Sequence, residues 1–192
     1  MPVYYHGSIV GGLTKLMPFS SPSANIPEAA VYLTVSKALS SIYIWNKEYK
    51  WMTFHIGEDD IPVYTETHKD ALYEFYNGVK GYIYACEGDY TVVSATGIKL
   101  AIVSYEPVPV SMCEPVENAY EKILSFETHN QLIIRRYEDL TIREHATNRN
   151  MILGCIKRLN LLNEKHPLSA FVKSHFRNLW EDAKCIDKTI NI

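Results

Sequence analysis

Residues 4–8 read Tyr-Tyr-His-Gly-Ser, and residues 31–34 read Val-Tyr-Leu-Thr. Both stretches are short runs rich in aromatic and β-branched residues, a composition typical of strands. Ser36 follows the second stretch and is a favoured residue type at the N-cap of a helix. Apolar residues then recur at helical spacing, at Ala38, Leu39, Ile42 and Trp45. This part of the chain therefore predicts two strands followed by a helix over residues 36–45.

The rest of the chain shows strand-like and helix-like patterns in turn, with no internal repeat. A loop is predicted at 18–27, and further strands at 51–56, 62–65, 81–86, 90–93, 100–104 and 131–137. Two prolines in residues 107–110 lack an N–H group, which places that segment at a sheet edge or a bend. Helices are predicted at 69–76, from Glu114 onwards and beyond Glu138, with a break near Pro167.

This order of elements predicts an α+β protein. The expected fold is a split antiparallel β core with short inserted helices and a C-terminal helical region, because strands and helices do not alternate regularly as in a doubly wound sheet. The predicted domains are residues 1–137, as an α+β core, and residues 138–192, as a helical C-terminal extension packed on the core.

The composition is that of an ordinary globular protein: 192 residues, 47% apolar, 21% charged and a net charge of −3. No run approaches 18 apolar residues, so we expect no membrane partner. Basic residues near the C-terminus are mixed with acids, as on a solvated helix face, which makes nucleic acid an unexpected partner. The start lacks a secretory pattern, which favours a cytoplasmic protein with reduced thiols. No metal is expected, because neither the histidines nor the cysteines show the short sequence spacings of metal ligands. The four cysteines are Cys86, Cys113, Cys155 and Cys185.

The segments YYHGS at residues 4–8 and VYLTVSKA at residues 31–38 resemble the ADP-ribosyltransferase superfamily. The similar branch is the His-Tyr-Glu type, which includes rifamycin ADP-ribosyltransferase-like and related bacterial proteins. The resemblance covers residues 3–45 well and 98–112 loosely, and it implies a split β core of that type for residues 1–137. It also implies that NAD is the substrate.

The resemblance makes five residues candidates for binding NAD: His6, Gly7, Ser8, Tyr32 and Tyr43. In that family the His hydrogen-bonds a ribose hydroxyl, the Gly offers backbone groups to the nicotinamide amide, and the Tyr stacks on the nicotinamide ring. The residue types suit these roles, because imidazole can donate or accept, glycine allows close backbone approach and an aromatic face suits a flat cation. The alternative is that His6 and Tyr32 are ordinary core residues.

The third family element is a glutamate that stabilises the positive charge that builds on the ribose as nicotinamide leaves. The resemblance points to Glu106, in the segment Val-Ser-Tyr-Glu-Pro-Val at residues 103–108, as the catalytic residue. Glu87, Glu114 and Glu117 are rival candidates. The chain has no Glu-x-Glu or Gln-x-Glu pair, which argues against modification of protein arginines.

The leading hypothesis is therefore an NAD-dependent mono-ADP-ribosyltransferase-like enzyme that transfers ADP-ribose to an unknown acceptor and releases nicotinamide. The alternative is a catalytically inactive protein of the same fold that acts as a nucleotide- or protein-binding module. A relationship to RNA 2′-phosphotransferases ranks last, because that chemistry needs a basic phosphate site and residues 1–129 are acidic on balance.

Overall fold

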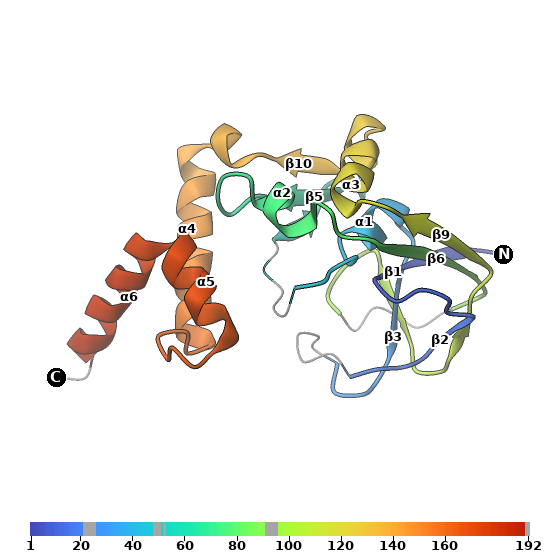
Figure 1. Cartoon of the computed structure of the whole chain (residues 1–192), viewed down its shortest axis with the longest axis horizontal. Coiled ribbons are helices and arrows are strands. Elements are labelled where there is room, and N and C mark those ends of the chain that lie inside the picture. The colour runs from blue at the N-terminus through green and yellow to red at the C-terminus, as the bar shows by residue number, and fades with distance from the viewer. Residues whose placement is uncertain (21–25, 48–50, 52, 91–95, 191–192) are drawn as a thin grey trace. The chain divides into compact units, whose positions relative to one another are not determined.

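The computed structural model describes residues 1–20, 26–47, 51, 53–90 and 96–190 (Figure 1). Its described residues form an α+β structure with an antiparallel sheet and six α-helices, which confirms the predicted class. The chain divides into two compact units. Unit 1 comprises residues 1–46, 52–66 and 70–135, and unit 2 comprises residues 47–51, 67–69 and 136–192. The packing of residues 138–192 on the core stays a prediction.

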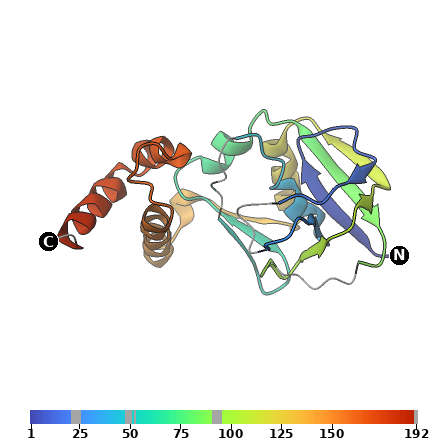
Figure 2. The same cartoon turned by 90° about the horizontal axis from the view of Figure 1, so that it is seen from below.

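The main sheet of unit 1 has five strands in the order β7-β3-β1-β6-β9, all paired antiparallel (Figure 2). These strands are β7 (Ala101–Ser104), β3 (Val31–Thr34), β1 (Val3–Ser8), β6 (Gly81–Glu87) and β9 (Met112–Val116). The predicted strands at the start of the chain, near 81–86 and near 100–104 are thus confirmed. The predicted strand at 90–93 has residues 91–93 outside the described part of the chain.

Two smaller sheets complete the strands of unit 1. In one, β5 (Pro62–Thr65) lies between β4 (Phe54–Ile56) and β10 (Ile133–Arg135), and only the β5–β10 pair is parallel. In the other, β2 (Lys15–Leu16) pairs with β8 (Val108–Pro109). The proline-bearing segment thus forms a short two-stranded ribbon, as expected for residues that lack a backbone donor.

One face of the main sheet packs around aromatic and aliphatic side chains. A buried cluster joins β1, β2, β3, β6 and β8 through Tyr4, Leu16, Val31, Leu33, Tyr84, Cys86 and Val108. Burial raises the pKa of the Cys86 thiol to about 11, so the thiol stays protonated at neutral pH. The alternation of side chains along β1 and β3 assigns this face to Tyr4 and Leu33.

Helix α1 (Lys37–Ser41) contacts β1, β3 and β6 and also contacts α3 (Ala119–Thr128) (Figure 2). Its N-cap is Ser36, whose side chain accepts from the N–H of Leu39 at 3.1 Å, as predicted. The predicted continuation to residue 45 is wrong. The hydroxyls of Ser40 and Ser41 donate to carbonyls three residues earlier, both at 2.7 Å. Such local bonds compete with the regular helical ladder, and the chain leaves the helix at Ile42.

Residues 114–116 also differ from the sequence prediction, which began a helix at Glu114. They belong to β9, where Glu114 pairs with Ile83 and Val116 with Gly81. Pro115 is tolerated there because β9 is an edge strand of the described sheet. The helix begins only after Asn118, whose side chain accepts from the N–H of Tyr120 at 3.1 Å.

Helix α2 (Ala71–Tyr76) confirms the helix predicted at 69–76, with a later start. Its N-cap, Asp70, has a φ of 58° and makes no side-chain cap bond. The helix ends at Asn77, and Gly78 follows with a φ of 73°. The Asn-Gly pair therefore terminates the helix as predicted, because glycine adopts the left-handed conformation at little cost.

Unit 2 is mainly helical beyond residue 138, as predicted. It contains a short 3₁₀ turn, Tyr137–Asp139, and the helices α4 (Ile142–Arg158), α5 (Pro167–His175) and α6 (Arg177–Ile190). Pro167 begins α5, where its missing N–H costs nothing. Helix α6 packs against α4 and α5, and Trp180 is fully buried. No helix among the described residues is long and apolar enough to cross a membrane.

Candidate functional site

His6 lies in β1 and is half-buried. Its Nδ1 lies 2.8 Å from the backbone oxygen of Tyr32 in β3. Because a carbonyl only accepts, Nδ1 carries the proton in this bond. In a neutral imidazole this leaves Nε2 as the acceptor nitrogen. The structure therefore brings His6 to the strand that carries Tyr32, and it orients the His6 ring from that strand.

Strands β1 and β3 are paired far less extensively than β1 and β6. The β1–β3 register consists of the single pair Tyr5–Thr34 within the described strands, whereas six residue pairs join β1 to β6. If the β1–β3 ladder continued past the Tyr5–Thr34 pair, a backbone N–H of β1 would bond the Tyr32 carbonyl. The His6 ring donates to that carbonyl instead. Within the described strands, no residue pair continues the β1–β3 ladder from Tyr5–Thr34 towards His6 and Tyr32.

The alternation of side chains limits how His6 and Tyr32 can act together. Counted from the Tyr5–Thr34 pair, Tyr32 points to the same face as Tyr5, and His6 points to the opposite face. The core agrees with this assignment, since Leu33 packs with Tyr4 in one cluster and Tyr32 packs in another. A ligand that contacts both side chains would therefore have to reach both faces of the sheet.

The ring of Tyr32 is half-buried among apolar side chains. It packs against a small cluster that includes Ala30 and Val103, and its centroid lies 5.2 Å from that of Phe19. The Tyr32 hydroxyl is buried and has no hydrogen-bond partner among the described residues. Burial, followed by the nearby phenol of Tyr105, raises the pKa of Tyr32, so this hydroxyl is a neutral donor at physiological pH.

Gly7 and Ser8 follow His6 in β1 and have structural partners. A Cβ on Gly7 would lie 2.0 Å from the backbone oxygen of Ser40, so glycine is required there by the approach of α1. The Ser8 hydroxyl accepts from the N–H of Val10 at 3.1 Å. Packing thus accounts for the glycine of the His-Gly motif, and a nicotinamide contact stays a prediction.

Tyr43 follows the end of α1 and is half-buried. Its ring lies edge-on to that of Phe54 in β4, with centroids 6.1 Å apart. Burial raises the pKa of Tyr43 to about 12, which keeps the phenol neutral. Its predicted role in binding NAD stays a prediction.

Glu106 comes two residues after β7, the neighbour of β3 in the sheet. The Ser104 hydroxyl accepts from the N–H of Glu106 at 3.2 Å and donates to its carbonyl at 2.8 Å, which holds the backbone in a tight turn. The side chain of Glu106 is exposed, and its carboxylate forms no ion pair within the described part of the chain. The preceding residue, Tyr105, interacts electrostatically with Tyr32.

Two of the rival glutamates are engaged in ion pairs. Glu114 binds Lys37 of α1 and, at 2.6 Å, Lys122 of α3. Partial burial acts to raise the pKa of Glu114, but hydrogen bonds and charge from the two lysines outweigh it and lower the pKa. Glu117 pairs with Lys80 at 2.7 Å, whereas Glu87 is exposed at the end of β6. These contacts leave Glu106 and Glu87 as the stronger candidates.

The three principal candidates therefore lie on consecutive strands or directly after one. His6 is in β1, Tyr32 is in β3, and Glu106 follows β7. Together they offer an oriented imidazole, a neutral buried phenol and an exposed carboxylate. These groups can donate to hydroxyls and stabilise a developing positive charge.

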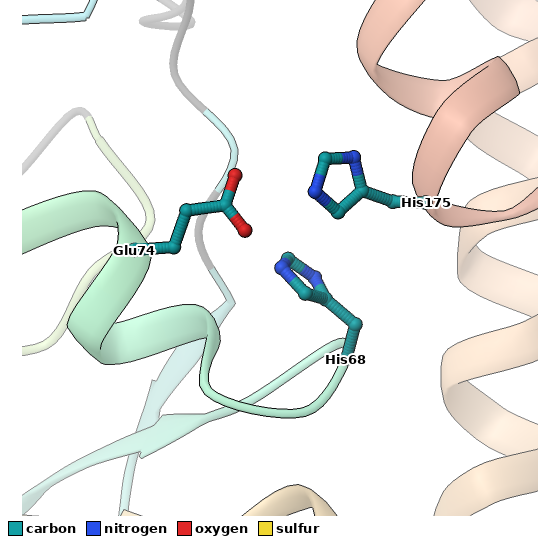
Figure 3. A group of neighbouring side chains, drawn as sticks. All are labelled: His68, Glu74 and His175. Carbon is teal, nitrogen blue, oxygen red and sulfur yellow. The ribbon is translucent and has the colours of Figure 1, made fainter.

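Unit 2 contains a histidine pair that the sequence patterns missed. The ring centroids of His68 and His175 lie 4.7 Å apart, and Figure 3 shows the two imidazoles side by side; Glu74, also labelled there, belongs to unit 1. The Nδ1 of His175 lies 3.0 Å from the backbone oxygen of Phe171, and the Nδ1 of His68 lies 3.2 Å from the Thr67 hydroxyl. Each histidine offers a nitrogen within 4.8 Å of the other, so the pair could contribute to a divalent metal site. Two ligands are fewer than the three or four protein ligands of typical zinc centres, and more than a hundred residues separate these histidines in the sequence.

Comparison of the chain with protein-family models, with curated proteins and with solved structures finds no match in any of the three.

Proposed function

We propose that this protein is an NAD-dependent mono-ADP-ribosyltransferase-like enzyme, with an ADP-ribosyltransferase-type core in unit 1. The observation that carries the proposal is the placement of His6 in β1, of Tyr32 in β3 and of Glu106 two residues after β7, because these three strands are consecutive neighbours in the sheet. The imidazole of His6 is oriented by the strand of Tyr32, and Tyr105, which precedes Glu106, interacts electrostatically with Tyr32. His6 and Tyr32 point to opposite faces of the sheet, so the proposal requires that NAD reach both faces at β1 and β3.

In this proposal NAD is a substrate that supplies an ADP-ribosyl group when its bond to nicotinamide breaks. His6 accepts a hydrogen bond from a ribose hydroxyl through Nε2, while Nδ1 donates to the Tyr32 carbonyl. The buried hydroxyl of Tyr32 gains a hydrogen-bond acceptor when the ligand is bound, which removes the cost of leaving that group unpaired. The Glu106 carboxylate stabilises the positive charge on the ribose during bond cleavage.

The proposal is tested by Glu106→Ala in the full chain, incubated with adenine-labelled NAD and a cell lysate. Release of nicotinamide and labelling of macromolecules should fall about two to three orders of magnitude, the usual effect of removing one electrostatic stabiliser. NAD affinity, measured by calorimetry, should stay close to that of the unchanged protein. The matched control is Glu117→Gln, which alters an exposed, lysine-paired glutamate. Equal nicotinamide release by Glu106→Ala and the unchanged protein would remove Glu106 from the mechanism.

A second candidate function is a nucleotide- or protein-binding module of the same fold without catalytic activity. It is favoured by the opposite faces of His6 and Tyr32 and by the packing of the Tyr32 ring in an apolar cluster. This alternative predicts no release of nicotinamide by the unchanged protein. If calorimetry then detects NAD binding that His6→Ala weakens, the module replaces the enzyme.

A further inference from the structure

Unit 2 contains an open cavity of about 650 Å³ whose lining is basic. Two arginines and two histidines line it, and no aspartate or glutamate does among the described residues. Ligand-binding pockets commonly have volumes of about 300–1,000 Å³. The cavity is therefore large enough for a small organic molecule, and the charge of its wall favours an anion.

Helix α4 supplies one wall through side chains at helical spacing. His145, Asn148, Arg149 and Ile152 all line the cavity, and positions three, four and seven residues apart share one helix face. Asn148 is only 8% exposed, so its amide is buried at the base of this wall. This wall therefore combines charged and polar side chains with one buried apolar side chain, that of Ile152.

The other wall comes from the end of α5 and the start of α6. His175, Phe176 and Arg177 contribute here, followed by the next two residues of α6. The first turn of α6 contains no acidic residue, so no side chain of that turn neutralises the partial positive charge of the helix N-terminus. The N–H groups of this turn add to the field of the arginines, and Phe176 offers an apolar surface.

The two arginines differ in their partners. Arg149 donates to the Asp182 carboxylate at 2.9 Å, with both side chains about half exposed. A guanidinium has five N–H donors, so one such bond leaves others for a ligand. Arg177 is exposed and forms no ion pair within the described residues. Guanidinium groups bind phosphate oxygens through paired hydrogen bonds.

We infer that this cavity binds a small phosphorylated molecule, with the phosphate held by Arg149, Arg177 and the first turn of α6. The volume exceeds that of a phosphate group, and Phe176 and Ile152 can cover an apolar part of the ligand. This inference is independent of the proposed function, because the cavity is lined by residues of unit 2 alone.

Calorimetric titration of the full chain with sodium pyrophosphate at low salt tests this inference. One equivalent should bind, and Arg177→Gln should weaken the affinity about tenfold or more, because hydrogen bonds to charged groups are lost. Asp182→Asn should strengthen binding severalfold, because it releases Arg149 from its carboxylate partner. The matched control is Arg143→Gln, which removes an exposed arginine of α4 that does not line the cavity.

The outcomes separate this site from general attraction to basic surface. Circular dichroism of each variant verifies that the helices remain folded. Equal weakening by Arg177→Gln and Arg143→Gln would overturn the inference, because it would show unspecific attraction. Absence of pyrophosphate binding at millimolar concentration would overturn it as well, and so would binding that none of the three variants alters.

Discussion

Gly7→Ala should destabilise unit 1 strongly, because β1 and α1 approach each other closely at Gly7. The added Cβ would lie 2.0 Å from the carbonyl oxygen and 3.0 Å from the carbonyl carbon of Ser40, in α1. The clashing atoms belong to the backbone, so no side-chain rotation can relieve the contact. Strand β1 and helix α1 must separate by about 1.4 Å or more to restore ordinary contact distances.

The cost should lie at or above the upper end of the usual range for overpacking, about 3 kcal/mol in the free energy of unfolding. For a chain of this size that corresponds to a fall in melting temperature of about 6–12 °C. Urea denaturation followed by circular dichroism measures the loss. Hydrogen exchange with mass spectrometry should show faster exchange in peptides from β1 and α1.

The matched control is Gly154→Ala, in the exposed interior of α4, where an added Cβ meets no atom within 4 Å. Alanine is the better helix former there, so this variant should be more stable by about 0.5–1 kcal/mol. If Gly7→Ala unfolds within about 0.5 kcal/mol of the unchanged protein, the close approach of β1 and α1 is refuted. The glycine of the His-Gly motif would then require another explanation, such as backbone contact with a ligand.

Two further predictions concern electrostatics and helix capping. Glu114→Gln should lower stability by about 0.5–1 kcal/mol at pH 7, because it breaks a partly exposed ion network with two lysines. The pKa of Glu114 is lowered in the folded state, so the stability that its carboxylate contributes is present above the unfolded pKa and is lost as the pH falls through the folded pKa. Urea titrations at several pH values should therefore show the stabilities of Glu114→Gln and the unchanged protein converging in acid. A stability difference that stays constant with pH would contradict the argument. Thr141→Ala should cost about 1 kcal/mol, because Thr141 and Glu144 form a reciprocal capping box at the start of α4. Thr147→Ala, within the same helix, should cost less, and an equal loss for both would count against the cap.

The fold was predictable wherever local signals act alone. The strand Pro62–Thr65, the stop at Asn77-Gly78 and the helix break near Pro167 all appear as predicted, because turn residues and prolines restrict the backbone directly. Predictions failed where pairing with another element overrides the local sequence pattern. Residues 114–116 carry helical spacing, yet pairing with β6 makes them a strand.

The candidate site was predictable only in part, for the same reason. The family resemblance made His6, Tyr32 and Glu106 candidates, and the strands that contain or precede them, β1, β3 and β7, are neighbours in the sheet. The face of each side chain follows from the strand register, which the sequence does not encode locally. The hydrogen bond from His6 to the Tyr32 carbonyl and the pairing of Glu114 with two lysines could not be read from spacing.

By itself the sequence determined the α+β class, most element positions and the helical character of the C-terminal region, because these depend on residues close together in the chain. Only the tertiary structure decided which strands are neighbours, which glutamates are neutralised and how distant residues gather. The basic cavity of unit 2 illustrates the difference, since Arg149 and Arg177 belong to separate helices. Their proximity depends on helix packing, and packing is a property of the folded chain.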